Sequence, residues 1–432
     1  MRNELEALFE RIDLNWCDNP EKGIEASENY TRLLALFPNL QELNQEWIQT
    51  DAFEFNRTIR HIFRCFKVYY LLKDGAYSYD SLSKDSHEKL RQKIKWFTVQ
   101  NELLLPILLM YHDIGRFVDR AAHTYHSANL IVRRGLLDAF KLSETEKLIL
   151  RKTIEYHLLL ATIYTGESTF FGLLSLLNDK EFTQILKTKD GKNIEFFVDL
   201  LEIFTYIDVL GYPYSRIYDH YLIYYEQINK TLQSLLRLWP NQVKITSKAR
   251  EYSLQWTDWR LVCALRIFQF INTEPYLTKD FYFDALKQSL RSECEDRGVK
   301  FDWSSIKTKY LSHNYKFQAK YALAFLMLLT FGEFKRAKLD RAQKVSAKLL
   351  RFWILLSAEI NRRGLNAEES VWNIYFQKLP FWSDIPKGFS EKLEINALKS
   401  VIQNATLRFD KDRKEYNLFL DFSDLLESTR KI

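Results

Sequence analysis

The sequence carries very few of the residues that make turns. Glycine and proline number 12 and 8 in a chain of 432 residues, well below the usual shares of roughly 7% and 5%. Between them run long segments whose apolar residues recur with a helical period. Because glycine and proline are the strongest breakers of regular structure, their scarcity favours long helices. We predict an all-α fold, with strand character confined to a short hairpin near 405–420.

Polar stretches without helical period divide the predicted helices into regions. The stretch RLWPNQVKIT at 237–246 contains a proline and loses the period, which is typical of a linker. Ser143 and Glu146 match the capping-box pattern S-x-x-E and indicate a helix start. We therefore expect four regions: a helical segment at 1–50, a helical domain at 51–236, a linker at 237–250 and a second helical domain, with no indicated role, at 251–432.

Charge and cysteine usage narrow the classes of partner and compartment. Residues 240–432 hold 33 Lys and Arg against 23 Asp and Glu, whereas residues 1–239 hold 29 against 33. One predicted helix presents five cations on one face, which fits either a solvated surface or a contact for phosphate or an acidic partner: Lys338, Arg341, Lys344, Lys348 and Arg351. The four cysteines form no CxxC pair and no apolar run reaches 18 residues. We expect free thiols in the cytoplasm and no membrane span.

The stretch MYHDIGRFVDR at 110–120 follows the apolar run ELLLPILLM and places His112 next to Asp113. Burying two ionisable groups is costly unless each has a partner. The first half of the chain offers further histidines on apolar helices, at His61, His126 and His157. Imidazole and carboxylate together are an ordinary ligand set for a divalent cation. The alternative is a hydrogen-bonded His–Asp pair with no metal.

These residues resemble the HD superfamily of metal-dependent phosphohydrolases. The pattern of that family is a histidine, an adjacent His-Asp doublet and a later aspartate, each on a different helix. Here it matches His61 in RTIRHIFRCF, His112-Asp113 in LLLMYHDIGR and Asp208 in IFTYIDVLGY. Many members add two histidines between doublet and aspartate, matched by His126 in HTYHSAN and His157 in TIEYHLLLA, with His123 as an alternative to His126.

The resemblance covers about residues 51–225 and is greatest for the hydrolytic domain of bacterial uridylyl-removing enzymes. The HD-GYP cyclic dinucleotide phosphodiesterases do not fit. Their GYP precedes the final aspartate, whereas Gly211-Tyr212-Pro213 follows Asp208 here. The resemblance implies one or two divalent ions, with Mn, Mg, Fe, Zn, Ni or Co as candidates. His61, His112, Asp113 and Asp208 would hold the first ion, and His126 and His157 the second, with Asp113 bridging.

The implied activity is hydrolysis of a phosphate ester by metal-bound hydroxide. The expected substrate is a nucleotide, another phosphorylated small molecule or a nucleotidylated protein. Arg116, three residues after Asp113, is the first candidate for contacting the phosphate, and Arg57 and Arg64 lie one turn either side of His61. Asp113 and Arg116 are thus the expected catalytic residues. Two other functions use the same ligands: a non-catalytic regulatory or nucleotide-binding module, and a di-iron oxygenase of HD fold.

Overall fold

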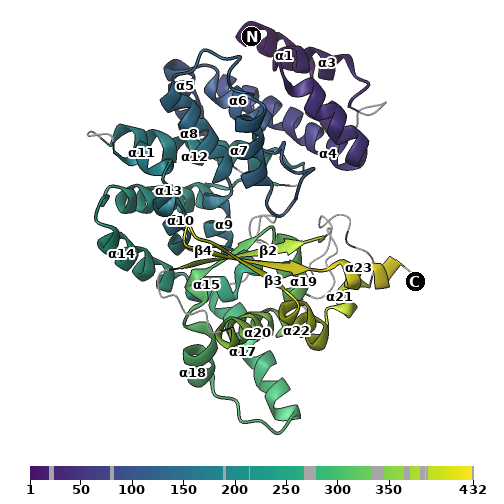
Figure 1. The fold of residues 1–432 in the computed structure, drawn as a ribbon, viewed down its shortest axis with the longest axis vertical. Coiled ribbons are helices and arrows are strands. Elements are labelled where there is room, and N and C mark those ends of the chain that lie inside the picture. Colours follow the sequence, from purple (N-terminus) through teal and green to yellow (C-terminus); the bar gives the residue numbers. More distant parts are fainter. Residues whose placement is uncertain are drawn as a thin grey trace. The chain divides into compact units, whose positions relative to one another are not determined.

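The structure is a computed structural model that describes residues 1–18, 24–77, 82–187, 191–213, 215–266, 279–331, 345–363, 370–379, 385 and 388–430. The chain forms two compact units (Figure 1). Unit 1 comprises Met1–Ala161 and Gln184–Arg237, and unit 2 comprises Thr162–Thr183 and Leu238–Ile432. Both units are largely helical. No helix in the described part of the chain combines the length and apolarity that a bilayer span needs.

Unit 1 consists of helices joined by short connections. They are α1 (Arg2–Arg11), α2 (Leu14–Asp18), α3 (Glu28–Ala35), α4 (Leu40–Asp74), α5 (Lys84–Gln100), α6 (Leu104–Tyr111), α7 (His123–Arg133), α8 (Glu144–Glu155), α12 (Lys192–Leu210) and α13 (Asp219–Leu236). Helices α9 (Leu159–Thr165) and α11 (Phe182–Leu186) cross the unit boundaries. The predicted capping box is present at the start of α8, where Ser143 and Glu146 bond reciprocally.

The core of unit 1 explains why residues 1–50 belong to it rather than forming a separate segment. Phe9 of α1 is fully buried and stacks on Phe66 of α4 with ring centroids 4.9 Å apart. Helix α4 is kinked at Asp51, whose backbone is non-helical and whose side chain accepts a hydrogen bond from the Glu54 amide. The expected break near residue 50 is therefore a kink within one helical element. Helices α4, α6, α8 and α12 pack against one another.

Unit 2 contains a four-stranded sheet, of which the all-α prediction included only the hairpin near 405–420. Its strands are β1 (Phe317–Lys320), β2 (Val371–Gln377), β3 (Thr406–Asp410) and β4 (Glu415–Asp421), in the spatial order β1-β2-β4-β3. Strands β1, β2 and β4 are parallel, and β3 pairs antiparallel with β4. The β3–β4 hairpin is the one predicted near 405–420. The other two strands are short and aromatic, so their alternation was hidden among aromatic helices.

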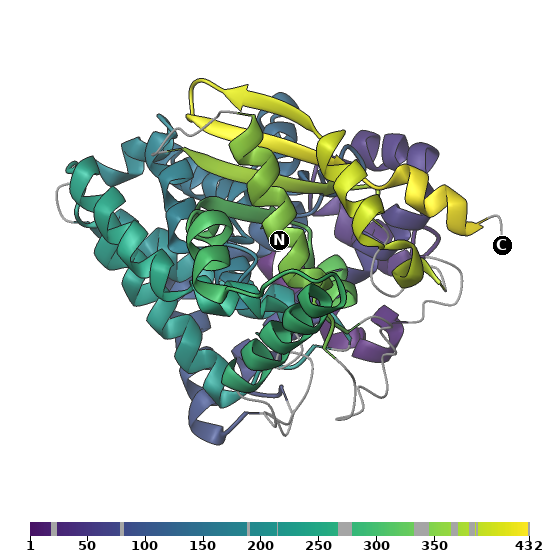
Figure 2. The same ribbon diagram turned by 90° about the horizontal axis from the view of Figure 1, so that it is seen from below.

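Helices cover the apolar face of this sheet (Figures 1 and 2). Phe325 of α19 (Leu323–Phe331) and Phe352 of α20 (Lys348–Arg362) both contact Phe376 of β2. The remaining elements of unit 2 are η1 (Phe170–Gly172), α10 (Leu173–Asn178), α14 (Gln242–Gln255), α15 (Thr257–Leu261), α17 (Lys279–Asp296), α18 (Trp303–Ile306), η2 (Lys307–Leu311), η3 (Asn314–Lys316), α21 (Phe389–Lys392), α22 (Ile395–Gln403) and α23 (Ser423–Arg430).

Two segments differ from the expected domain boundaries. The expected linker at 237–250 is mostly helix α14, which begins after Asn241 because that side chain accepts a hydrogen bond from the Lys244 amide. The segment 162–183 belongs to unit 2 because its backbone is bonded there. The Ala319 amide of β1 donates to the Glu167 carbonyl at 2.8 Å, and the Phe171 amide donates to the Ser253 hydroxyl at 2.8 Å.

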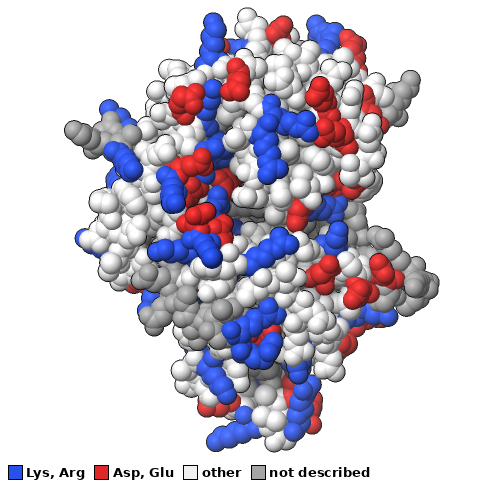
Figure 3. Space-filling model, in the orientation of Figure 1, with Lys and Arg blue, Asp and Glu red and all other residues white. Residues whose placement is uncertain are grey.

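Acidic and basic side chains are interspersed on the face of the molecule drawn in Figure 3. Of the basic helix face predicted at Lys338–Arg351, the first three cations lie outside the described residues. The other two are paired within unit 2: Lys348 with Glu394 at 3.0 Å and Arg351 with Glu293 at 2.5 Å. These two cations are therefore part of local ion pairs.

Candidate metal centre

The His112-Asp113 doublet lies at the buried end of α6. Every residue of that helix is buried, and the side chains of His112 and Asp113 are 0% and 1% exposed. Gly115 lets the following turn lie against the start of α7. A Cβ atom at this position would lie 2.3 Å from the Ser127 amide nitrogen and 2.4 Å from the His123 carbonyl oxygen. Only a glycine permits this close approach, which brings the first turn of α7 beside Asp113.

One group of ligand atoms joins α4, α6 and α12. The Nε2 atom of His61 lies 2.8 Å from the Asp208 Oδ1 atom, and its Nδ1 atom lies 3.2 Å from the Gly211 carbonyl oxygen. The Nε2 atom of His112 lies 3.5 Å from the same Asp208 oxygen and 3.4 Å from the Asp113 Oδ2 atom. The packing of these helices therefore brings together the four residues expected to hold the first ion.

A second group of ligand atoms shares Asp113 with the first. The Oδ1 atom of Asp113 lies 3.2 Å from the His123 Nε2 atom and 4.0 Å from the His157 Nε2 atom. The His123 and His157 rings are 5.3 Å apart, and the His112 and His157 rings are 5.5 Å apart. Asp113 thus lies between two sets of imidazoles: His61 of α4 and His112 at the end of α6 on one side, and His123 of α7 and His157 just after α8 on the other.

Three of these imidazoles are oriented in the same way. The Nδ1 atoms of His112, His123 and His157 lie 2.9, 2.7 and 2.8 Å from backbone carbonyl oxygens three residues earlier, at Leu109, Arg120 and Ile154 respectively. A carbonyl can only accept, so each Nδ1 carries a proton and each Nε2 is the ring atom that faces Asp113 and can bind a cation once it is deprotonated. This second-shell bond is the usual way in which a protein fixes a metal-ligating histidine.

The donor atoms fit a divalent cation. Ligands about 2.0–2.2 Å from one ion lie roughly 3–4 Å from one another, and the three-residue groups His61/His112/Asp113 and Asp113/His123/His157 have their ligand atoms within 4.8 Å. The His112 Nε2 atom and both Asp113 carboxylate oxygens are buried, and their contacts are ion pairs at 2.6–3.5 Å rather than well-aligned hydrogen bonds. Buried polar atoms are usually fully hydrogen-bonded, so these ion-paired atoms are candidates for binding an ion.

The pKa shifts reflect this concentration of charge. Burial lowers the pKa of His112, but the charge of Asp113 and the bonds to Asp113 and Asp208 outweigh it and raise the pKa to about 10. Burial and the neighbouring His123 and His112 lower the pKa of His157 to about 3. Burial raises the pKa of Asp208, yet hydrogen bonds with His112 and His61 hold it below its ordinary value. Burial also raises the pKa of Asp113, but the charges of Arg116, His112 and His123 outweigh it and hold the pKa well below its ordinary value. Both aspartates are therefore ionised at neutral pH.

Arg116 links the centre to a second cluster of charges. Its Nε atom lies 2.6 Å from the Asp113 Oδ2 atom, and its Nη2 atom donates to the Tyr212 hydroxyl at 3.2 Å. Its Nη1 atom lies 3.8 Å from the Oε1 atom of Glu54, a buried carboxylate on α4. Tyr212 also stacks on the His61 ring with centroids 4.2 Å apart. Arg116 thus lies beside Asp113, and its predicted contact with a phosphate stays a prediction.

Two of the expected residues lie elsewhere. His126 is half-buried on α7 with its ring against Tyr125, and the candidate group on this helix contains His123 instead. The reason is the helix phase: α7 begins at His123, so residue 126 is already on the next turn. Arg64 does not face the centre through its charged group, because that group binds the Asp18 carboxylate at 3.0 Å.

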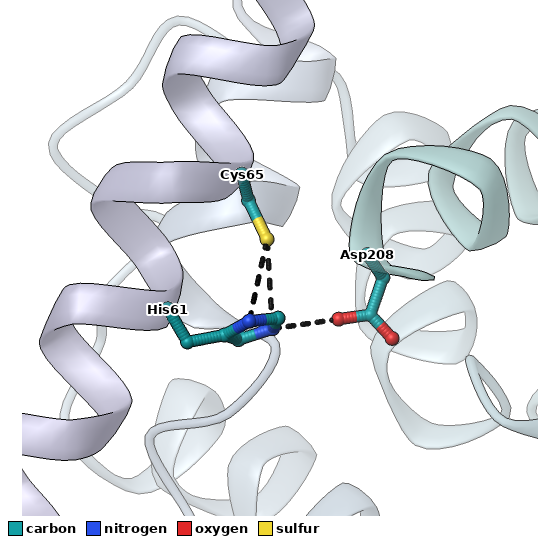
Figure 4. Close-up of side chains that lie close together, drawn as sticks. All are labelled: His61, Cys65 and Asp208. Atoms are coloured by element: carbon teal, nitrogen blue, oxygen red, sulfur yellow. Dashed lines mark hydrogen bonds and ion pairs between the residues drawn. The ribbon is translucent and has the colours of Figure 1, made fainter. Parts of the chain in front are cut away.

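Cys65 and Glu54 are components of this region that the sequence patterns did not indicate. Cys65 lies one turn after His61, and its Sγ atom is 3.5 Å from the His61 Nε2 atom (Figure 4). Asp208 approaches the same ring from α12. A Cβ atom on Gly211 would lie 2.3 Å from that sulfur, so this glycine leaves space for it. Cys65 could have been found from the sequence, because it lies four residues after His61 on the same predicted helix. No comparable spacing to the predicted ligands pointed to Glu54.

Searches with this chain identify no relative: no family model, no curated protein and no solved structure matches it. The resemblance to the HD superfamily therefore rests on the residues themselves and stays a prediction.

Proposed function

We propose that unit 1 is a metal-dependent phosphohydrolase or phosphodiesterase that acts on a nucleotide or on a nucleotidylated or otherwise phosphorylated substrate. The observation that supports this most is the convergence of six side chains, Asp113 and five others, from five helices or the turns that follow them. Four of them are imidazoles and two are carboxylates: His61, His112, His123, His157, Asp113 and Asp208. Such a set is expensive to bury without a cation to share the negative charge.

A divalent cation held by these residues would supply Lewis acidity, which polarises a phosphoryl oxygen and makes water acidic enough to react near neutral pH. Asp113 lies between the two groups of imidazoles, so each of its carboxylate oxygens faces one group. Arg116 lies beside Asp113, so its positive charge would stabilise the negative charge of a phosphate bound at the centre. Tyr212 fixes both the Arg116 side chain and the His61 ring.

The first experiment tests whether the purified full chain holds a metal. Elemental analysis is expected to find one to two equivalents of a transition metal or of added Mn²⁺. His123→Ala is expected to lose metal, whereas His126→Ala, on the same helix but outside both groups, keeps it. Equal loss in the two variants, or no metal in the wild type under Mn²⁺ loading, would refute the assignment.

The second experiment tests the reaction. The Mn²⁺-loaded protein is expected to hydrolyse bis(p-nitrophenyl) phosphate or members of a nucleotide panel, and the His112→Ala/Asp113→Ala variant should be inactive. Two other results would replace the proposal. Metal binding without turnover of any phosphate ester would favour a non-catalytic module. Oxygen consumption by the iron-loaded protein would favour an oxygenase, since imidazole and carboxylate also suit iron.

A further inference from the structure

Cys65 places a soft donor atom beside the first ligand group of the candidate metal centre. Its side chain is fully buried, and its Sγ atom lies 3.5 Å from the His61 Nε2 atom and 3.9 Å from the Nδ1 atom (Figure 4). The ligand atoms of His61, Cys65 and Asp208 all lie within 4.8 Å of one another. The sulfur is therefore close enough to these two ligands to share one ion with them.

The distance between the sulfur and the imidazole nitrogen suits a shared metal ion. The Nδ1 atom of His61 faces the Gly211 carbonyl oxygen at 3.2 Å, which leaves Nε2 as the ligand atom. A nitrogen at about 2.0–2.1 Å and a sulfur at about 2.3 Å from one tetrahedral ion lie roughly 3.6 Å apart. The observed separation of 3.5 Å between Nε2 and Sγ is close to this value, so His61 and Cys65 need little rearrangement to bind one ion.

The chain at Gly211 passes directly beside this sulfur. A Cβ atom there would lie 2.3 Å from the Cys65 Sγ atom and 2.8 Å from the His61 Cε1 atom. The φ angle of Gly211 is −64°, which any residue adopts, so it is the close approach that requires a glycine. Three residues after Asp208, the chain thus makes room for both the sulfur and the ring.

The surroundings of Cys65 fit a metal ligand better than a reactive or a space-filling thiol. Burial and the charges of Asp208 and Asp113 raise the pKa of the thiol well above its ordinary value, which disfavours a nucleophilic role. A cysteine that only fills space behaves as a small apolar residue, whereas this sulfur lies against an imidazole that is itself held by a carboxylate. A metal ion that coordinates the sulfur would deprotonate it.

We propose that Cys65 is a metal ligand, so that its group with His61 and Asp208 binds a thiophilic ion such as Zn²⁺ or Co²⁺. This rests on the proposed function, because it adds a ligand to the same metal centre. The second group, which shares Asp113 with the first, offers only nitrogen and oxygen donors. Soft thiolate ligands select zinc, whereas oxygen ligands suit manganese and magnesium. The two groups therefore differ in the metal that each prefers.

Absorption spectroscopy of the cobalt-loaded full chain tests this inference, because a thiolate bound to Co²⁺ gives a charge-transfer band in the near ultraviolet. The wild type is expected to show the band, and Cys65→Ala should lose it. Zn²⁺ affinity, measured by competition with a chromophoric chelator, should fall by at least about 10-fold in this variant, since a direct ligand is lost. Mn²⁺ affinity should fall by less than about 3-fold, because Mn²⁺ prefers oxygen donors.

Cys17→Ser is the matched control. Cys17 is also buried in unit 1, but it belongs to none of the candidate metal groups among the described residues, so this variant should keep both the band and the Zn²⁺ affinity. If Cys65→Ala does not fold, Cys65→Ser keeps the volume and replaces sulfur with oxygen, and the same loss of the band is expected. A wild-type protein without the band, or a folded Cys65 variant that retains it, would overturn the inference, as would equal losses of Zn²⁺ and Mn²⁺ affinity.

The spectrum and the phosphate-ester assay separate this inference from the proposed reaction. If the band depends on Cys65 but no phosphate ester is hydrolysed, the thiolate ligand stands and the proposed reaction falls. If phosphate esters are hydrolysed but the cobalt-loaded wild type shows no band, the reaction stands and the inference falls.

Discussion

Both units bury charged side chains, but the two sets have different kinds of partner. In unit 2, Arg260 is fully buried, donates to the carbonyl oxygens of Glu167 and Asn314, and lies over the Trp353 ring at 4.9 Å. In unit 1, the Asp113 carboxylate and the His112 Nε2 atom form ion pairs with other charged or titratable side chains, among them Arg116 and His123. A buried charge that binds backbone carbonyls and an aromatic ring stabilises the fold. A buried carboxylate surrounded by imidazoles that could also bind a cation indicates a binding site.

The largest expected effect is at the shared ligand of unit 1. Asp113→Asn keeps the volume but removes the negative charge that both ligand groups share. We expect metal affinity to fall by more than about 100-fold, since changes in the second shell alone cost 10- to 100-fold. Equilibrium dialysis against a metal buffer measures this. Unchanged affinity would show that Asp113 is held by Arg116 for structural reasons alone.

The corresponding change in unit 2 should affect stability instead. Arg260→Met leaves the Asn314 carbonyl without its Arg260 donor and the Glu167 carbonyl with the Ala319 amide alone. We expect the free energy of unfolding of unit 2 to fall by about 3 kcal/mol. Urea denaturation measures the loss, and elemental analysis of the folded variant should find wild-type metal content. A variant that unfolds normally but binds less metal would contradict the comparison between the units.

The pair of histidines on α7 gives a smaller effect. His123→Ala should weaken binding of one ion by about 10- to 100-fold, through loss of a ligand oriented by the Arg120 carbonyl. His126→Ala should change affinity by less than about 2-fold, because His126 is outside both ligand groups. Titration with Mn²⁺ followed by electron paramagnetic resonance distinguishes them. A larger loss of affinity in His126→Ala than in His123→Ala would show that His126 is the ligand, as predicted from the sequence.

The dependence on pH should be the smallest effect, up to about 10-fold per pH unit. The pKa of His112 is about 10 in the metal-free protein, so a cation must displace its proton at pH 7.5, and affinity rises with pH. His157, with a pKa of about 3, is already neutral. Calorimetry in buffers of different ionisation enthalpy is expected to show about one proton released per protein from these two residues, and none from His112→Gln.

The same shift sets a stability window for the metal-free protein. The pKa of His112 is raised above its unfolded value of roughly 6.5, so its stabilising contribution is complete below that pH and disappears as the pH rises through about 10. Alkaline unfolding of the metal-free wild type should therefore begin earlier than that of the metal-loaded protein. Coincident alkaline transitions in the two forms would contradict this.

The sequence predicted those parts of the centre that depend on residue order along apolar helices. His61, the doublet, His157 and Asp208 could be found because each adjoins a buried helical face. The choice between His123 and His126 could not be made, because it depends on where α7 begins, and helix starts are weakly encoded without a capping residue: Ala122 caps nothing with its side chain. Glu54 was missed because its arginine partners, apart from Arg57, are more than 60 residues away.

The fold was predicted where local pattern decides it and missed where long-range pairing does. The β3–β4 hairpin is local, with two strands joined by a short turn, and it was expected. Strands β1 and β2 pair in parallel across more than 50 residues, so no turn signal links them. Likewise the assignment of 162–183 to unit 2 depends on hydrogen bonds to partners such as Ser253, which no local pattern reveals.

Segment 162–183 is synthesised well before the rest of unit 2, and this separation constrains when unit 2 can fold during synthesis. The Thr169 amide bonds the Gln318 side chain, which is 149 residues further along the chain. At a synthesis rate of roughly 5–20 residues per second, about 8 to 30 s pass before that partner exists. During this time Phe171, which is buried in the finished protein, is without its ring partner Tyr315 of η3. Nascent chains that contain segment 162–183 but end before Gln318 are therefore expected to be a preferred target of chaperones. Chains that end before residue 162 are not.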